Sequence, residues 1–398
     1  MAAHNLLKEV GVVFFLVTCL CNGIFGLDLS DKCGDVLPGC FCTDYYIDCQ
    51  GAEFQDIREI YPFITKQTYR IRMTDGNLVS IPGNVFTNDE LIGPLTELKY
   101  LNLSGNGIVS IDGAAFQELP NLKTLDLSNN DVIVDSCDSS SKLANIFNSL
   151  MNIEYLSLHN TIRRKTSEPC GLGFMFSSAN MSHLTSLDIS DNGFDIIDEE
   201  MKSFLCETYT LTSLNVSYNL MTSFQIPLCS NNLKMLDLSM NQISYLDHVD
   251  VEIIESFVNL ESIRFRGNPF HCECSLAYFI FWVNETNQPI DADHITCASS
   301  TNSSLIGHPI KGLEYAAYCE PMIAICYGPR HVVRLAKPTF IGIVAGGLIV
   351  AVIIISSVIY CRRRSRRQHK TTTTTTKMGA ESSMTGDVSK NTLYSRMV

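Results

Sequence analysis

LKYLNLSGNGI at residues 98–108 and LKTLDLSNNDV at residues 122–132 decide the fold of this chain, because later stretches repeat their pattern. The later copies are LTSLDISDNGF (184–194), LTSLNVSYNLM (211–221) and LKMLDLSMNQI (233–243). Each fits L-x-x-L-x-L-x-x-N-x-L, with other apolar residues at some Leu positions. Weaker copies begin at Ile153 and Leu260, and a degenerate one covers 69–86. Such repetition is typical of a solenoid.

The spacing of the apolar residues predicts short parallel strands. In L-x-L the two leucines point to one side of a strand and the middle residue to the other. Stacked copies then share one continuous core, with Phe116 placed to fill its outer curve. The Asn at the ninth position turns inward, where its amide can bond backbone groups of neighbouring turns. We expect this ladder from Asn106, Asn130, Asn192, Asn219, Asn241 and Asn268.

The pattern resembles the leucine-rich repeat. The resemblance implies an α/β leucine-rich-repeat solenoid, curved, with a parallel β-sheet on its concave face and about eight repeats over 68–266. Insertions at 131–152 and 161–183 lengthen two repeats. Such loops often bind ligands, although tolerated decoration explains them equally well.

Two apolar segments outside the repeats predict a membrane protein. Residues 1–26 combine Lys8, an apolar run and small residues, which is typical of a secretory signal peptide. Residues 340–361 are uncharged and long enough to cross a bilayer as a helix. Five arginines follow within 362–367, so the positive-inside rule places the C-terminus in the cytoplasm. The chain is therefore expected in the plasma membrane, as a single-pass type I protein.

Charge divides the chain at the membrane segment. The tail 362–398 holds nine Lys/Arg and two acidic residues, so its net charge is +7. Because the whole chain has a net charge of −13, residues 1–361 carry −20. An acidic exterior argues against nucleic acid as a partner. The basic cluster favours contact with membrane lipid over 340–367, or simply stops transfer through the membrane.

Thirteen of the 16 cysteines lie between residues 27 and 339, a part expected outside the cell, where disulfides are the default. Cys137, Cys170, Cys206 and Cys229 accompany the irregular repeats, and Cys137–Cys170 with Cys206–Cys229 is one of three pairings that the sequence leaves open. Five glycosylation sequons fall in the same part: Asn102, Asn180, Asn215, Asn284 and Asn302. Glycans on the strand positions Asn102 and Asn215 would direct ligands to the edge loops or to bare parts of the concave face.

Four cysteines stand at each end of the repeats, where a solenoid needs caps. The stretch from Asn268 to Trp282 resembles the C-terminal cysteine cap of extracellular leucine-rich-repeat receptors, such as Toll-like receptors and variable lymphocyte receptors. The resemblance implies Cys272–Cys297 and Cys274–Cys319, and at the N-terminal cap Cys33–Cys42 and Cys40–Cys49. The 37 residues after Cys361 are too few for a TIR domain.

These features predict seven parts in order. They are a signal peptide (1–26), an N-terminal cap (27–67), repeats (68–266), a C-terminal cap (267–320), a stalk (321–339), a transmembrane helix (340–361) and a cytoplasmic tail (362–398).

Three sharper interpretations have weaker support. His271, Cys272 and Cys274 could suggest zinc, but the C-x-C spacing does not suit a structural zinc site, and no cofactor is expected. Catalytic motifs are missing from the sequence, so we expect no enzyme. Asp126, Asp188 and Asp237 recur at one repeat position. They form either an acidic row that attracts a basic ligand or ordinary filler of the repeat.

Cys326 is the unpaired exterior cysteine, and Gly342 with Gly346 forms a G-x-x-x-G helix-packing motif. Together they favour a homo- or heterodimer. Tyr394 and Met397 in the tail resemble a sorting or SH2-binding motif, and Cys361 is a palmitoylation candidate.

The sequence thus predicts a cell-surface receptor or recognition protein that binds a protein or microbial ligand, with a role in innate immunity, and signals through a partner or its tail. The alternative is an adhesion or matrix-organising protein whose tail only anchors it.

Overall fold

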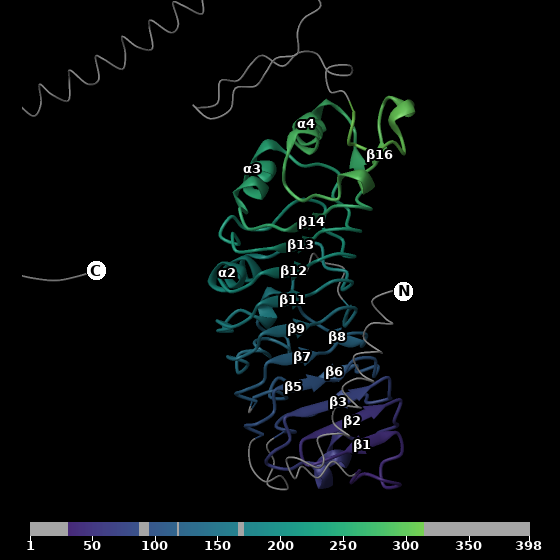
Figure 1. The fold of residues 1–398 in the computed structure, drawn as a ribbon, viewed down its shortest axis with the longest axis vertical. Coiled ribbons are helices and arrows are strands. Elements are labelled where there is room, and N and C mark those ends of the chain that lie inside the picture. Colours follow the sequence, from purple (N-terminus) through teal and green to yellow (C-terminus); the bar gives the residue numbers. More distant parts are fainter. Residues whose placement is uncertain (1–30, 87–94, 118, 166–170, 314–398) are drawn as a thin grey trace, which may run out of the picture. The chain divides into compact units, whose positions relative to one another are not determined.

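The computed structural model describes residues 31–86, 95–117, 119–165 and 171–313, which all belong to the unit Met1–Ile323 (Figure 1). Several predictions concern residues outside these ranges: the signal peptide, the stalk, the helix 340–361, the tail, and Cys170, Cys319, Cys326, Gly342, Gly346, Cys361, Tyr394 and Met397. Within the described ranges, no helix combines the length and apolar character needed to cross a membrane.

One ten-stranded sheet organises the described residues, and its strands stack in chain order from β1 to β14 (Figure 1). β1 and β2 are antiparallel, and every later neighbour in the sheet is parallel. The order is β1 (Cys40–Cys42), β2 (Tyr46–Gln50), β3 (Arg70–Thr74), β5 (Tyr100–Asn102), β7 (Thr124–Asp126), β9 (Tyr155–Ser157), β11 (Ser186–Asp188), β12 (Ser213–Asn215), β13 (Met235–Asp237) and β14 (Ser262–Arg264).

Shorter elements complete each turn of the chain. Three small parallel pairs join β4 (Ser80–Ile81) to β6 (Ser110–Ile111), β8 (Val132–Val134) to β10 (Ile162–Arg164), and β15 (Phe270–His271) to β16 (Cys297–Ser299). The α-helices are α2 (Glu199–Glu207), α3 (His248–Ser256) and α4 (Ala277–Glu285). The 3-10 turns are η1 (Ile57–Phe63), η2 (Gly173–Met175), η3 (Cys274–Leu276), η4 (Ala292–His294) and η5 (Ser303–Leu305).

The register of the sheet follows the repeat pattern. The second Leu of each copy lies opposite its counterpart in the next strand, so these side chains form a buried row: Leu101, Leu125, Leu156, Leu187, Leu214, Leu236 and Ile263. A slip of one residue would turn this row to solvent, because successive side chains on a strand alternate. The leucine-rich-repeat solenoid predicted from the sequence is therefore the observed fold.

A second buried row of phenylalanines lies on the return path of the chain. The rings of Phe116 and Phe147 are 6.4 Å apart between centroids, Phe147 and Phe176 are 5.3 Å apart, and Phe176 and Phe204 are 4.7 Å apart. Each ring comes from a different repeat, so the row links four successive repeats. Aromatic pairs at these separations stabilise a core beyond the area they bury.

The predicted asparagine ladder is present. Asn130 Oδ1 accepts hydrogen bonds from the backbone N–H of Asn106 (3.2 Å) and Ile108 (2.9 Å) in the preceding repeat. Its Nδ2 donates to the carbonyls of Leu127 (2.6 Å) and Leu103 (3.1 Å). Each amide thus pairs backbone groups that would otherwise be buried without partners.

Thr161 stands where the repeat pattern expects Asn, and the structure explains why it is tolerated. Its hydroxyl donates to the carbonyl of Leu127 at 2.8 Å, which replaces the amide donor. Its own N–H and that of Ile162 donate to Asn192 Oδ1 at 2.9 and 2.7 Å. The ladder therefore continues across the exception.

Disulfides and an aromatic lid close the ends of the sheet. Bonds join Cys33 to Cys42 and Cys40 to Cys49 at the β1 end, Cys206 to Cys229 beside α2, and Cys272 to Cys297 after β14. Cys137 and Cys274 are also disulfide-bonded. Phe279 on α4 packs on Phe270 and Trp282 at ring distances of 5.1 and 5.8 Å, so α4 covers the core beyond the last strand.

Asp198 begins α2 and also holds the turn η2 in place. Its carboxylate accepts hydrogen bonds from the N–H of Met201 (2.8 Å) and of Gly173 (3.1 Å). A Cβ on Gly173 would collide with this carboxylate, so only glycine allows the approach. Burial raises the pKa of Asp198, and the nearby Glu200 and Glu199 raise it further against the lowering effect of its hydrogen bonds.

Asn130→Ala tests the ladder. The change leaves buried backbone groups of two repeats without partners, so the free energy of unfolding should fall by about 3 kcal/mol. Urea unfolding of the purified chain measures it. Asn121→Ala is the matched control, because Asn121 is exposed and its side chain donates to the exposed carbonyl end of another loop, that of Thr96, rather than to the buried ladder. Equal losses in both variants would show that the ladder amide has no special role.

Asp198→Asn tests the buried cap. Because the folded pKa is raised, the stabilising contribution of Asp198 is fully present below its unfolded pKa of about 3.9 and is lost as pH rises through the folded pKa. Asn keeps the capping acceptor without the charge. The melting temperature of the variant should therefore gain on the wild type as pH rises from about 4 to 7. Glu200→Gln removes a charge that raises the pKa of Asp198, so in this background the gain of Asp198→Asn in melting temperature should be smaller. If the two melting temperatures differ by the same amount at every pH, the raised pKa of Asp198 is contradicted.

Candidate functional site

The outward side chains of the ten-stranded sheet form the main candidate surface, which we call the strand face. Within each strand the residues on either side of the buried Leu point away from the core. The strand face comprises Tyr46, Asp48, Arg70, Arg72, Tyr100, Asn102, Thr124, Asp126, Tyr155, Ser157, Ser186, Asp188, Ser213, Asn215, Met235, Asp237, Ser262 and Arg264.

Exposed tyrosines distinguish the half of the strand face between β2 and β9. Tyr69, just before β3, Tyr100 and Tyr155 are 38%, 43% and 38% exposed. The rings of Tyr69 and Tyr100 meet edge to face at 6.3 Å. Burial raises the pKa of Tyr155, and the Asp126 and Asp188 carboxylates add to the rise while a bond with Ser157 opposes it. All three side chains present both an apolar ring and a hydroxyl group.

These tyrosines were not predicted as site residues from the sequence. A signal existed, because Tyr100 and Tyr155 occupy the same position of their repeats. The pairing of Tyr69 with Tyr100 had no such signal, since the two residues are at different repeat positions.

The aspartates of the predicted acidic row accept hydrogen bonds from neighbouring side chains of the sheet. One oxygen of Asp126 accepts from the N–H (2.9 Å) and the hydroxyl (2.5 Å) of Ser128, and the other accepts from Asn102 Nδ2 at 3.0 Å. Asp188 bonds Ser190 and Asn215 in the same way, and Asp237 bonds Ser239 and Arg264. Of the two interpretations of this row, the structure supports structural filler, because every carboxylate already has local partners.

Two of the five sequons lie inside the strand face. Asn102 ends β5 and Asn215 ends β12, and both amides are half-buried and bonded to a neighbouring aspartate at 3.0 Å. Asn180, Asn284 and Asn302 are exposed. Asn302 caps η5, and Asn284 Nδ2 donates to the carbonyl of Ile280 at 2.9 Å. The exposed asparagines therefore offer more room for a glycan than the two strand positions.

The stretch His271–Cys274 is structural in this arrangement. Cys272 and Cys274 are both in disulfides, which leaves no thiolate there for zinc. His271 Nδ1 lies 2.8 Å from Ser299 Oγ, and Glu273 bonds Ser300 and Thr301, so these side chains fasten the cap. No group of three or more metal-binding side chains occurs in the ranges that the structure describes.

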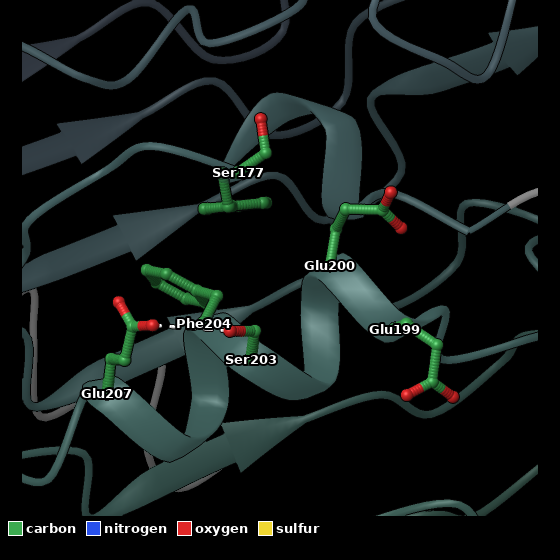
Figure 2. A pocket seen from close by; sticks show the side chains of 7 residues that line it. Ser177, Glu199, Glu200, Ser203, Phe204 and Glu207 are labelled. Carbon is green, nitrogen blue, oxygen red and sulfur yellow. Dashed lines mark hydrogen bonds between the residues drawn. The ribbon is translucent and has the colours of Figure 1, made fainter. Parts of the chain in front are cut away.

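A hollow of about 280 Å³ beside α2 is a second candidate site (Figure 2). Its lining residues are Phe176, Ser177, Glu199, Glu200, Ser203, Phe204 and Glu207. Ser203 Oγ donates to Glu207 at 3.2 Å, and Glu199 pairs with Lys202 at 2.7 Å. The acidic run DEE at 198–200 was the only sequence signal for it. The lining of the hollow thus combines three glutamates with two phenylalanines.

Comparison with known families identifies the repeats. A leucine-rich-repeat model matches residues 68–132 and 96–161, and a second leucine-rich-repeat model matches 180–195. The crystal structure of human 5T4, also called trophoblast glycoprotein, superposes with a TM-score of 0.59 at 20% identity and covers 72% of this chain and 99% of that one. At that identity the likeness shows a shared fold alone.

Three curated relatives extend the comparison. The transforming growth factor beta activator LRRC33 of Danio rerio is 28% identical over 68% of this chain and 41% of its own length. Trophoblast glycoprotein of Macaca fascicularis is 23% identical over 68% and 64%, and Toll-like receptor 6 of Dasypus novemcinctus is 26% identical over 58% and 27%. The chain thus spans less than two thirds of each of these relatives. The family models, the disulfides near the N-terminus and these relatives show that the chain contains leucine-rich repeats and is homologous to leucine-rich-repeat receptors.

Proposed function

We propose that this chain is a single-pass cell-surface recognition protein that binds a protein ligand on the tyrosine-bearing half of its strand face. The signal peptide at 1–26, the membrane helix at 340–361 and the arginines that follow support this placement. The homology to receptors supports a binding role. The proposal includes a microbial ligand as the alternative to a protein ligand, and it includes a role in innate immunity.

The exposed tyrosine cluster is the observation that carries the proposal. Tyr69, Tyr100 and Tyr155 sit on or beside strands that are fixed by the core below, so their rings lose little freedom on binding. Tyrosine is enriched at the energetic centres of interfaces because it combines apolar area with a polar tip. Salt bridges are poor candidates for the main contact, since the strand-face aspartates already have partners.

The name of the Danio rerio relative suggests a first probe. That protein is described as an activator of transforming growth factor beta, so this growth factor is tested beside a panel of extracellular proteins and microbial cell-wall preparations. Each probe is added to cells that display the full chain on their surface, and its binding to these cells is measured. The probe that binds above background defines the ligand for the mutational test.

Tyr100→Ala combined with Tyr155→Ala should weaken binding of that ligand by at least about tenfold, because two central aromatic contacts are lost. Tyr209→Ala is the matched control, since Tyr209 is 66% exposed but lies outside the strand face. Titration of labelled ligand on cells measures both variants at equal surface expression. Unchanged affinity in the double variant, or an equal loss in the control, would place the binding site elsewhere.

The adhesion alternative differs in what depends on the tail. Truncation after Arg367 removes Tyr394 and Met397 but keeps the basic cluster. A receptor that signals through its tail loses the cellular response and keeps ligand binding. An adhesion protein keeps cell attachment in full after the same truncation.

A further inference from the structure

One backbone position repeats along the edge of the sheet and always adopts the left-handed conformation. It is the residue just before the ladder position in each repeat. Its φ angles are 58° at Asp75, 70° at Gly105, 55° at Asn129, 48° at Asn160, 56° at Asp191, 56° at Tyr218, 56° at Met240 and 74° at Gly267. Glycine, asparagine and aspartate tolerate this conformation, but bulky side chains do so at an energetic cost.

Tyr218 and Met240 are the two exceptions, and the core does not explain them. They are 51% and 41% exposed, so neither side chain repays its backbone strain by burial. Leu220 beside them is 45% exposed, at a position where the preceding repeat has Gly193. Residues held in such strained backbone conformations cluster at functional sites.

Backbone hydrogen bonds place these residues on consecutive rungs. The N–H of Asp191 donates to the carbonyl of Ser217 (3.0 Å), that of Tyr218 to Ser239 (3.0 Å) and that of Met240 to Arg266 (2.8 Å). Neighbouring strands are about 4.8 Å apart, so Tyr218 and Met240 are direct neighbours. A Cβ on Gly267 would collide with Met240 Sδ, which shows that the thioether lies over this glycine.

The charges at the two ends of this row are opposite. Asp191 lies one rung before Tyr218, and Arg266 lies one rung after Met240. Both side chains are exposed, and neither has an ion pair within the described part of the chain. By contrast, the nearby Arg264 pairs with Asp237 at 3.0 Å. We call Asp191, Tyr218, Leu220, Met240 and Arg266 the edge patch.

We propose that the edge patch binds a second copy of this chain. A two-fold axis between the rungs of Tyr218 and Met240 makes the patch complementary to itself, because the acid of one copy then faces the base of the other. Tyr218 meets Met240 of the second copy, which is a favourable sulfur–aromatic contact. Asp191 meets Arg266 of the second copy. The proposal does not depend on the ligand or the membrane placement proposed above.

The patch is small compared with the area that stable dimers bury, so the dimer is weak and needs concentrated protein. Sedimentation equilibrium of the purified full-length chain in detergent therefore provides the measurement. A Cys326→Ser background keeps an intermolecular disulfide out of the result. The dimerisation constant is compared among variants at fixed detergent concentration.

Charge reversal tests whether the partner is a second copy. Asp191→Arg and Arg266→Asp alone should each weaken the dimer roughly tenfold, because like charges then face each other. Both changes in one chain should restore it, since the pair is rebuilt with its charges exchanged. Asp75→Arg is the matched control, at the same backbone position outside the patch, and should leave the dimer unchanged. A double reversal as weak as the single ones, or a monomeric wild type, would overturn the proposal.

A second variant separates binding from folding. Tyr218→Asn with Met240→Asn installs the residue that Asn129 and Asn160 provide in other repeats, so it relieves the backbone and should keep or raise the melting temperature. The dimer should be lost at the same time. If the melting temperature falls and dimerisation stays, Tyr218 and Met240 serve the fold and the proposal fails.

Discussion

The hydrogen bonds of the asparagine ladder are the constraint on which the rest of this structure depends. Each turn of the chain leaves a short strand and brings backbone N–H and C=O groups into the interior, where water cannot pair them. A buried amide supplies one acceptor and two donors at that point, and it bonds its own repeat and the preceding one together. These bonds hold neighbouring repeats together at the turn after each strand, where the buried leucine rows of adjacent strands meet in register.

The same arrangement decides which polar side chains remain available for binding. Serines two residues after the strand-face aspartates use one carboxylate oxygen, and a residue of the adjacent strand uses the other. The aspartates thus stabilise the turn that follows each strand. The tyrosines do not stabilise these turns, because their rings lie on the sheet rather than within the turns. A face with a satisfied acidic row and free aromatic rings favours a ligand recognised through shape and apolar area.

The strand face and the edge patch are different surfaces of one repeat unit. The first uses residues within the strands, and the second uses left-handed residues that follow them, together with Leu220 and Arg266. A ligand on the tyrosine-bearing strands β3 to β9 leaves the rungs of β12 and β13 accessible. Ligand binding and self-association can therefore occur on the same chain. Substitutions on the strand face change the first, and substitutions in the edge patch change the second.

The sequence by itself determined the solenoid, the strand register and the ladder asparagines. It could do so because each of these depends on a pattern within one repeat, such as Leu at fixed spacing or Asn at the ninth position. The side chains of the candidate site were different. Whether Asp126 was free for a ligand depended on Asn102, 24 residues earlier, and the Tyr69–Tyr100 contact joined different repeat positions.

Repeats of unequal length separate such partners by variable distances in sequence, so their contacts follow only from the stacked strands. The strain at Tyr218 and Met240 also became visible only through the backbone, because an ordinary tyrosine or methionine in the sequence gives no sign of a positive φ. Local periodicity therefore determined the scaffold, whereas contacts between repeats decided which of its side chains are free to act.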